Sequence, residues 1–255
     1  MNRSVSIILP YYNRKKLLEI TLDSFEHFYS TVPQLEIVIV DDGSNDENRV
    51  VELIKKYSLN IQLVRLTEKT GVNPCYPYNV GVRRSVGDII VLTSPETFHT
   101  TNMFDISNNF KKLTDKTYFQ FSVFCLVADV QKIEKEKLCR GLGKRDYPYS
   151  NDCGSWYVHS KIRPSYLNFF SALTRNTYYD LSGFDERFRY GTGFDDEEFK
   201  IRVLEIVDEV IWFDDALAIH KNHEVVNNSA PTTNQGIFSA TRRDTYKFND
   251  DWGRL

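Results

Sequence analysis

The first hundred residues alternate between short apolar runs and segments with helical periodicity, and this alternation limits the fold more than any other feature. The apolar runs predict strands at Val5–Leu9, Glu36–Val40, Ile61–Leu66 and Asp88–Thr93. Apolar residues near helical spacing predict helices at Arg14–Tyr29, Asn45–Tyr57 and Pro77–Val86. Strands and helices that alternate at this spacing form a mostly parallel sheet flanked by helices, so we expect an α/β, Rossmann-like fold.

The composition excludes several functional classes. The 255 residues carry a net charge of -3, which gives no electrostatic reason to expect nucleic-acid or membrane binding. No apolar run approaches the roughly 20 residues of a membrane span, and no signal-peptide pattern opens the sequence. The cysteines (Cys75, Cys125, Cys139 and Cys153) show neither CxxC pairs nor zinc spacing, which favours free thiols in a reducing compartment. We therefore expect a cytoplasmic protein, with peripheral contact to the membrane left open.

The strongest local signal is EIVIVDDGSND, from Glu36 to Asp46. A buried strand ends there in Asp41 and Asp42, and ligands of open α/β sheets bind beyond the carboxyl ends of the strands. Gly43 allows the backbone to turn close to such a ligand. Ser44 or the residue after it could equally cap the next helix, and both roles are compatible. Two adjacent acids nevertheless exceed what a cap requires.

Two further segments carry polar residues at positions suited to a site. The first predicted strand ends in ILPYYNR, which places Pro10, Tyr11 and Asn13 at its tip. A glycine loop then leads into a helix at FDERFRYGTGFDDEEF, with acids from Asp195 to Glu198. Acids near a helix N-terminus are stabilised by its dipole, so capping is one explanation. A cap needs one or two of them, which leaves others for proton transfer.

Four motifs together resemble glycosyltransferase family 2: LPYYNR, IVIVDDGSND, YNVGVRRSVGDIIVLTSPE and GFDERFRYGTGFDDEEF. The similarity covers roughly residues 4–223. It implies the GT-A fold and the transfer of a sugar from a nucleotide diphosphate donor to an acceptor hydroxyl, with inversion at the sugar carbon. The donor contacts that the resemblance implies are Pro10, Tyr11, Asn13, Asp41, Asp42, Asn79 and Ser94.

The resemblance also implies a divalent metal, Mn²⁺ or Mg²⁺, at the donor diphosphate. The family's usual Asp-x-Asp motif is replaced here by Thr93-Ser94-Pro95-Glu96, so its first aspartate is absent. Glu96 can supply a carboxylate oxygen, which suits a hard cation. A histidine from WFDDALAIHKNH would be the second ligand, with His220 preferred over His223. The alternative is that Glu96 is a solvated acid and no metal is needed.

Within the acidic cluster, the resemblance assigns the general base to Asp196 and the binding of acceptor hydroxyls to Asp195. Glu198 is spaced to lie on a different face of the helix. The expected partners are a UDP- or GDP-sugar and a glycan or lipid-linked saccharide, with a homodimer left open. We expect one domain at 1–224, comprising a nucleotide-sugar half at 1–100 and an acceptor half at 101–224, followed by a polar C-terminal tail at 225–255.

Rival functions fit the sequence less well. A nucleotidyltransferase would show a glycine-rich basic loop after the first strand, and PYYNRKK has no glycine. A Rossmann oxidoreductase would show GxGxxG there. The altered metal motif is compatible with an inactive sugar-binding module, which stays an alternative, but the intact Asp195–Asp196 pair argues against it. Trp156 and Tyr157 are equally compatible with stacking on a sugar ring and with core packing.

Overall fold

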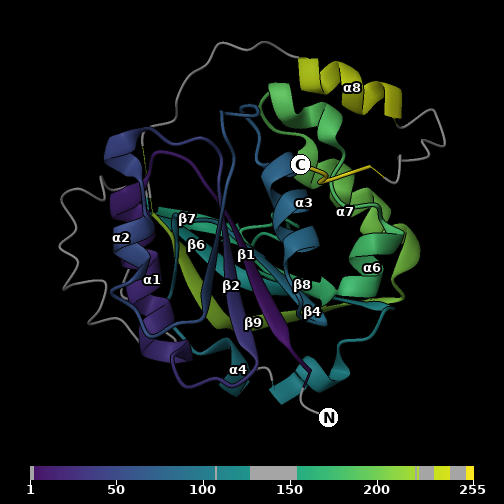
Figure 1. Ribbon diagram of the computed structural model, residues 1–255. Helices are drawn as coiled ribbons and strands as arrows, with labels where there is room; N and C mark the ends of the chain where they lie inside the picture. The colour runs from purple at the N-terminus through teal and green to yellow at the C-terminus, as the bar shows by residue number, and fades with distance from the viewer. Residues whose placement is uncertain (1–2, 107, 127–153, 222, 224–232, 242–250) are drawn as a thin grey trace.

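The computed structural model describes residues 3–106, 108–126, 154–221, 223, 233–241 and 251–255 (Figure 1). Its strands are β1 (Val5–Tyr11), β2 (Leu35–Asp41), β3 (Ile61–Arg65), β4 (Ile89–Thr93), β5 (Thr97–His99), β6 (Thr117–Leu126), β7 (Gly154–Val158), β8 (Phe170–Thr174) and β9 (Glu209–His220). Its α-helices are α1 (Lys15–Tyr29), α2 (Val51–Ile54), α3 (Cys75–Arg84), α4 (Met103–Ile106), α6 (Arg175–Asp180), α7 (Asp195–Ile206) and α8 (Thr233–Thr241). Short 3-10 helices lie at Asp46–Asn48, Asn108–Lys112 and Glu186–Tyr190.

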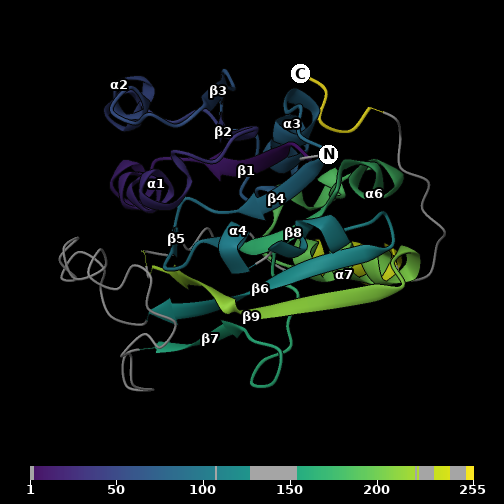
Figure 2. The ribbon, with the colours of Figure 1, turned by 90° about the horizontal axis from the view of Figure 1, so that it is seen from below.

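These strands form one sheet in the order β3-β2-β1-β4-β8-β6-β9-β5, with β7 paired to β6. Helices α1 and α2 cover one face, and α3, α6 and α7 cover the other (Figure 2). Alternate residues of each strand serve the two faces, because successive side chains point to opposite sides. In β1, Ile7 packs with Leu22 of α1, whereas Ile8 packs with Val80 of α3. The predicted α/β class is thereby confirmed.

The first half of the sheet is parallel, as the sequence predicts. Strand β1 pairs in parallel with β2 and β4, and β2 pairs in parallel with β3. The register aligns Tyr11 with Asp41, so the tips of β1 and β2 end at the same edge. The two polar strand ends are therefore brought side by side.

The second half of the sheet is mixed. Strand β8 is antiparallel to both β4 and β6, while β6 and β9 are parallel. The apolar run in Glu209–Phe213 predicts a strand of those five residues, but β9 continues to His220. The register shifts between Phe121 and Ser122, where the partner of β6 jumps from Phe213 to Leu217. Asp214 lies in this bulge and accepts hydrogen bonds from Ser122 and Ser160, so its charge does not end the strand.

Two predicted helices are shorter than expected. Asn45–Tyr57 contains the 3-10 turn Asp46–Asn48 and the four-residue helix α2. The Asn45 side chain accepts from the Asn48 amide and closes a tight turn, which interrupts the helical pattern. The pattern of Met103–Leu113 also predicts one helix, but the structure has the short helix α4 there, followed by a 3-10 turn. The polar segment Gln131–Cys153, including Cys139 and Cys153, lies outside the described residues, while Cys75 and Cys125 are free and buried.

The expectation of a polar C-terminal tail at 225–255 is corrected where the structure describes it. Trp252 is 7% exposed, and its ring lies 4.0 Å from the Arg83 guanidinium and 5.7 Å from the Tyr178 ring. Asn234 of α8 is also buried. Buried residues such as Trp252 and Asn234 anchor these pieces, and average composition does not reveal such individual contacts. Among the described helices, none has both the length and the apolar character that crossing a membrane requires.

The packing of α1 on the sheet gives a stability prediction. Leu22 is fully buried in the core between α1 and β1, and Leu22→Ala should lower the free energy of unfolding by about 2–5 kcal/mol because it leaves a cavity. Val51→Ala is the control, since Val51 is 44% exposed and should lose less than about 1 kcal/mol. Urea unfolding measures both, and equal losses would contradict this packing.

Candidate functional site

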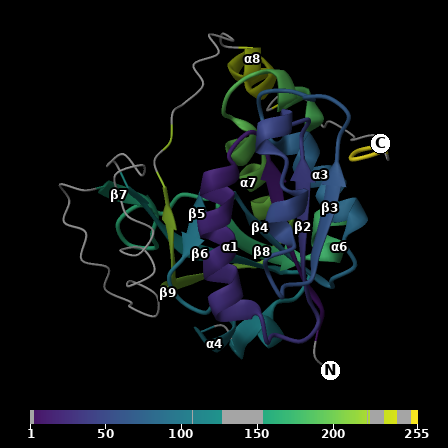
Figure 3. The ribbon, with the colours of Figure 1, turned by 60° about the vertical axis from the view of Figure 1, so that its left-hand side comes forward.

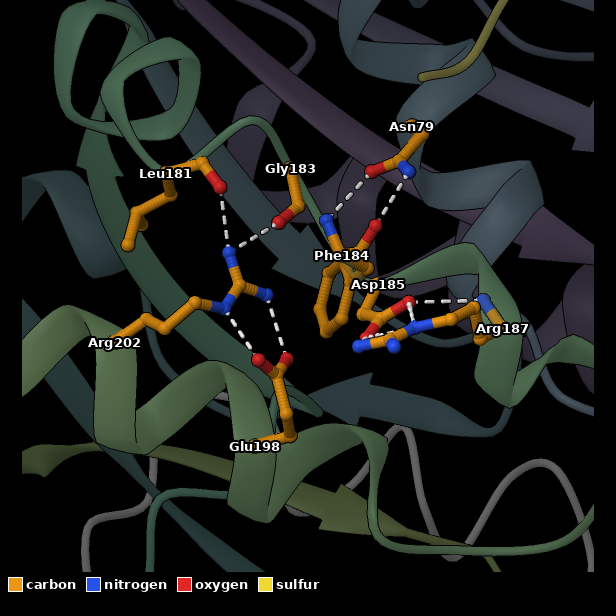
Figure 4. A network of polar contacts seen from close by, with 8 residues as sticks. All are labelled: Asn79, Leu181, Gly183, Phe184, Asp185, Arg187, Glu198 and Arg202. Atoms are coloured by element: carbon orange, nitrogen blue, oxygen red, sulfur yellow. Dashed lines mark hydrogen bonds and ion pairs between the residues drawn. The ribbon is translucent and has the colours of Figure 1, made fainter. Parts of the chain in front are cut away.

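The four acids at the start of α7 fall into two pairs with different surroundings. Glu197 forms an ion pair with Lys200, and Glu198 forms one with Arg202, both within the helix. Arg202 also donates to the carbonyl oxygens of Leu181 and Gly183 (Figure 4). Glu197 and Glu198 are therefore neutralised locally, and Glu198 is turned away toward Arg202 as its spacing predicts.

Asp195 and Asp196 have no such cation. Within the described residues, no lysine or arginine forms an ion pair with either of them. One Asp196 oxygen accepts from the backbone amide of Asn168 at 3.1 Å and from its side-chain amide at 2.7 Å. Burial and the negative charge of Asp195 raise the pKa of Asp196 to about 7. Burial likewise raises the pKa of Asp195, against a hydrogen bond from Asn73. Asp196 is thus a carboxylate poised to exchange a proton near neutral pH.

A second group of possible ligands lies at the end of β4. Glu96, His220 and His223 each offer a ligand atom, and these atoms lie within 4.8 Å of one another. The pairing of Thr97 in β5 with His220 in β9 brings the acid beside the histidines. The sequence leaves His220 and His223 as alternatives, and the structure brings both to Glu96.

The chemistry of this group fits a divalent cation. Burial lowers the pKa of His220 to about 4, so its ring is neutral and offers a lone pair at neutral pH. Its buried Nδ1 atom has no hydrogen-bond partner among the described residues. Burial raises the pKa of Glu96, but the charges of Arg14, His220 and His223 and a hydrogen bond from Arg14 together lower it, so the pKa lies below its ordinary value. At 5% exposure Glu96 is not a solvated loop acid.

The dipeptide Asn168–Phe169 joins the two groups. Asn168 holds Asp196, while the Phe169 ring lies 4.7 Å from the His220 ring. The Phe169 carbonyl accepts from the Thr93 hydroxyl, and the Tyr78 hydroxyl donates to the Thr93 carbonyl. Burial raises the pKa of Tyr78, and the charges of Asp196, Glu96 and Asp195 raise it further. The carboxylates of both groups therefore lie around one buried tyrosine.

Sequence reasoning misses Tyr78, Asn168, Phe169 and Asn73. Each is an ordinary residue outside the acidic motifs, and each acts through contacts between segments distant in sequence. The only available signal is an asparagine directly before an apolar strand, in LNFFSALT. That pattern also fits a plain turn.

The tips of β1 and β2 are joined by hydrogen bonds. The Asn13 amide donates to the Ser44 hydroxyl at 2.9 Å, and the Asn45 amide donates to the Asn13 side chain at 2.9 Å. Asn13 adopts the left-handed region with φ 51°, which asparagine tolerates better than most residues. Pro10 is buried in the same strand end. Ser94, at the end of β4, shares a hydrogen bond with Thr97 at 2.8 Å.

Asp41 and Asp42 are both almost fully buried and both have cationic partners. Arg65 pairs with Asp41, and the Ser44 amide donates to the same carboxylate. Lys69 lies 2.6 Å from Asp42, which also accepts from the Thr70 amide and hydroxyl. Gly43 has φ 73°, and a Cβ there would lie 2.3 Å from the Glu68 backbone. The β2 tip and the loop after β3 are thus locked together.

Two residues of the predicted donor site face elsewhere. The Tyr11 ring is 1% exposed in the core under α1, and its hydroxyl donates to the Asn48 carbonyl. Asn79 is fully buried, and its side chain bonds to both backbone groups of Phe184 (Figure 4) and to Glu186 and the Tyr178 hydroxyl. Both side chains are engaged in these buried contacts, and a donor contact from Tyr11 or Asn79 stays a prediction.

Comparisons with known proteins agree with this geometry. The sequence model of Glycosyl transferase family 2 matches residues 6–104. Poly(ribitol-phosphate) beta-N-acetylglucosaminyltransferase TarP of Staphylococcus aureus (strain N315) is 29% identical over 107 residues, or 42% of this chain, and the chain matches only about a third of TarP, 32%.

Two solved structures share the fold at low sequence identity. S. aureus TarS 1-349 in complex with UDP-GlcNAc has a TM-score of 0.62 at 16% identity, covering 87% of this chain and 59% of that one. The mannosyltransferase PcManGT of Pyrobaculum calidifontis, in complex with GDP-Man and Mn²⁺, has a TM-score of 0.59 at 19% identity, covering 99% and 68%. Residues 6–104 of the chain are therefore similar to glycosyl transferase family 2, and the chain has the GT-A fold.

Proposed function

We propose that this chain transfers a sugar from a UDP- or GDP-sugar to a hydroxyl of a glycan or lipid-linked saccharide, with inversion at the sugar carbon. The observation that carries the proposal is the state of Asp196, a carboxylate with no cationic partner among the described residues and a pKa raised to about 7. A general base works best when its pKa lies near the working pH. The family match and the nucleotide sugars bound by proteins of the same fold support the donor class.

In the proposed reaction, Asp196 takes the proton from the acceptor hydroxyl while that oxygen bonds to the anomeric carbon. The bond between this carbon and the diphosphate oxygen breaks on the opposite face, and the nucleotide diphosphate leaves with the electron pair. Attack opposite the leaving group accounts for inversion. The two amide hydrogen bonds from Asn168 fix the carboxylate, leaving its other oxygen for the acceptor. Asp195 raises the pKa of Asp196 and would bind acceptor hydroxyls.

The donor would lie across the strand tips. Pro10, Asn13, Asp41, Asp42 and Ser94 remain the proposed donor contacts, through backbone groups where their side chains are already bonded. Glu96, His220 and His223 would hold a divalent cation, which supplies positive charge to the diphosphate. The carboxylate oxygen favours Mn²⁺ or Mg²⁺, and the two imidazoles favour Mn²⁺ of that pair.

Asp196→Asn tests the base directly. The amide keeps the shape of the side chain but cannot accept the proton, so turnover should fall roughly 10²–10⁴-fold. Binding of the donor nucleotide, measured by calorimetry with UDP and GDP, should stay unchanged. Turnover is followed as nucleotide release with a panel of UDP- and GDP-sugars. Glu197→Gln on the same turn is the control, and full turnover of Asp196→Asn would refute the assigned role.

The pH dependence follows from the same carboxylate. Asp196 acts as a base only when ionised, so kcat/KM should rise with pH and level off above an acidic limb near pH 7. Because the two carboxyl groups interact, the pH at which this limb falls reflects the titration of the Asp195–Asp196 pair and not of one residue alone. In Asp195→Asn the neighbouring charge is lost, and the limb should move to lower pH. An unchanged limb in that variant would show that another group controls the rate.

Asp196 should also reduce stability at neutral pH. Its folded pKa of about 7 exceeds the ordinary value of 3.8, so the folded state binds the proton more tightly than the unfolded state. Stability is therefore lost as pH rises from about 4 to about 7. Asp196→Asn should melt at a higher temperature than wild type at pH 8, with a smaller gap at pH 4.5. A lower melting temperature at pH 8 would contradict the raised pKa.

Metal binding can be measured apart from turnover. Glu96→Ala and His220→Ala should each weaken Mn²⁺ binding by roughly tenfold or more in calorimetry with UDP or GDP present. EDTA should abolish turnover of the wild type. His27→Ala is the matched control, because His27 is an exposed histidine on α1. Mn²⁺ affinity that is equal in all three variants would remove this group from metal binding.

A further inference from the structure

The segment that precedes Asp195 and Asp196 has an unfavourable backbone conformation. Gly193 and Phe194 are consecutive residues in the left-handed region, with φ 69° and φ 68°. Glycine adopts this region freely, but phenylalanine does not. Such a conformation persists only where neighbouring contacts hold it, and it directly sets where Asp195 and Asp196 begin the helix.

One side of this segment is fixed by the nucleotide-binding half of the chain. The Arg189 carbonyl accepts from the amides of Val72 at 2.7 Å and Asn73 at 3.0 Å. Asn73 also bonds to Asp195. A Cβ on Gly71 would lie 2.3 Å from the Arg189 oxygen, so the two backbones touch.

The other side is fixed by α8. The side-chain amide of Asn234 donates to the Phe188 carbonyl at 3.0 Å and to the Gly193 carbonyl at 2.9 Å. Asn234 is 2% exposed, so these bonds form out of water. One turn further along α8, the Phe238 ring lies 5.4 Å from the Phe194 ring. The helix thus contacts both left-handed residues, and Figures 1 and 3 place it directly above α7.

The end of the chain contacts the same region at a second point. The Gly253 amide donates to Glu186 at 2.6 Å, and Glu186 also accepts from Asn79. A Cβ on Gly253 would lie 2.6 Å from the Asn79 backbone, so the C-terminal residues pack directly against α3 at this point. Two described pieces of the C-terminal residues therefore hold the segment that runs from Glu186 to Phe194.

We infer that α8 is a positioning element for the proposed base, with Asn234 and Phe238 as positioning residues that act through Gly193 and Phe194. The structural part of this inference is independent of the proposed function. Its expected effect on catalysis rests on the proposed role of Asp196 as the base. Asn234 holds the last turn before α7, and this hold keeps Asp196 against Asn168. When the hold is lost, the carboxylate becomes more solvated and its pKa falls toward the ordinary value.

Hydrogen–deuterium exchange of the full chain tests the structural part without any substrate. Asn234→Ala should speed exchange of the amides at 191–198 by about tenfold or more, because two hydrogen bonds to the preceding loop are lost. Exchange in β1 and β2 should stay as in wild type. Gln235→Ala is the matched control, since Gln235 is an exposed neighbour on α8. Unchanged exchange at 191–198, or an equal rise throughout the chain, would overturn the inference.

Kinetics test the functional part. Asn234→Ala should lower kcat by about tenfold and move the acidic limb of kcat/KM to lower pH, while UDP and GDP affinities stay within twofold. Phe238→Leu keeps apolar packing without the ring contact and should act in the same direction, which covers the case where Asn234→Ala does not fold. An unmoved limb in both variants, or nucleotide affinity that falls in proportion to kcat, would overturn it. Full turnover of Asp196→Asn would instead refute the proposed function and leave the exchange result to decide on α8.

Discussion

Asp195 and Asp196, which pair with no lysine or arginine in the described part of the chain, impose the constraint that the rest of the site must meet. Adjacent negative charges in partly buried surroundings destabilise the fold unless hydrogen-bond donors or a helix dipole compensate. Here the compensation comes from the first turn of α7 and from the amides of Asn73 and Asn168. These are neutral donors, so they stabilise the carboxylates without lowering the pKa of Asp196 as far as an arginine would. The site therefore keeps a proton acceptor near neutrality.

The same logic explains why neighbouring acids are treated differently. Glu197 and Glu198 follow Asp196 directly in the sequence, yet each forms an ion pair within the helix. Glu197 pairs with Lys200, and Glu198 pairs with Arg202. Glu198 in particular is enclosed with Arg202, whose guanidinium also binds two loop carbonyls. That pair fastens α7 to the loop after α6. One turn of helix thus contains two acids that pair with cations of the same helix and two that have no such partner among the described residues.

The sequence predicts the sheet and the acidic positions well, because both depend on local patterns. The buried strands read as apolar runs, and parallel pairing then brings the ends of β1 and β2 together without further information. It predicts poorly which face a polar side chain takes. Asn79 lies in the motif YNVGVRRSVGDIIVLTSPE, which resembles the family. Its side chain nevertheless forms hydrogen bonds with both backbone groups of Phe184. Asn168 and Asn234 could not be found, since each acts across the fold on a segment far away in the chain.

Glu96 has contacts in two directions, to Arg14 and to the two histidines of the proposed metal site. Glu96 is buried and its charge is balanced by Arg14, which pairs with one oxygen of the carboxylate. A carboxylate oxygen of Glu96 also lies within 4.8 Å of a ring nitrogen of His220 and of His223. Arg14 opens α1 directly after the β1 tip, so the same short segment carries a proposed donor contact, Asn13, and the cation that keeps Glu96 ionised. A buried acid kept ionised in this way needs no proton release before it binds a positive charge, and it sits at the edge of the sheet where we propose that the donor binds.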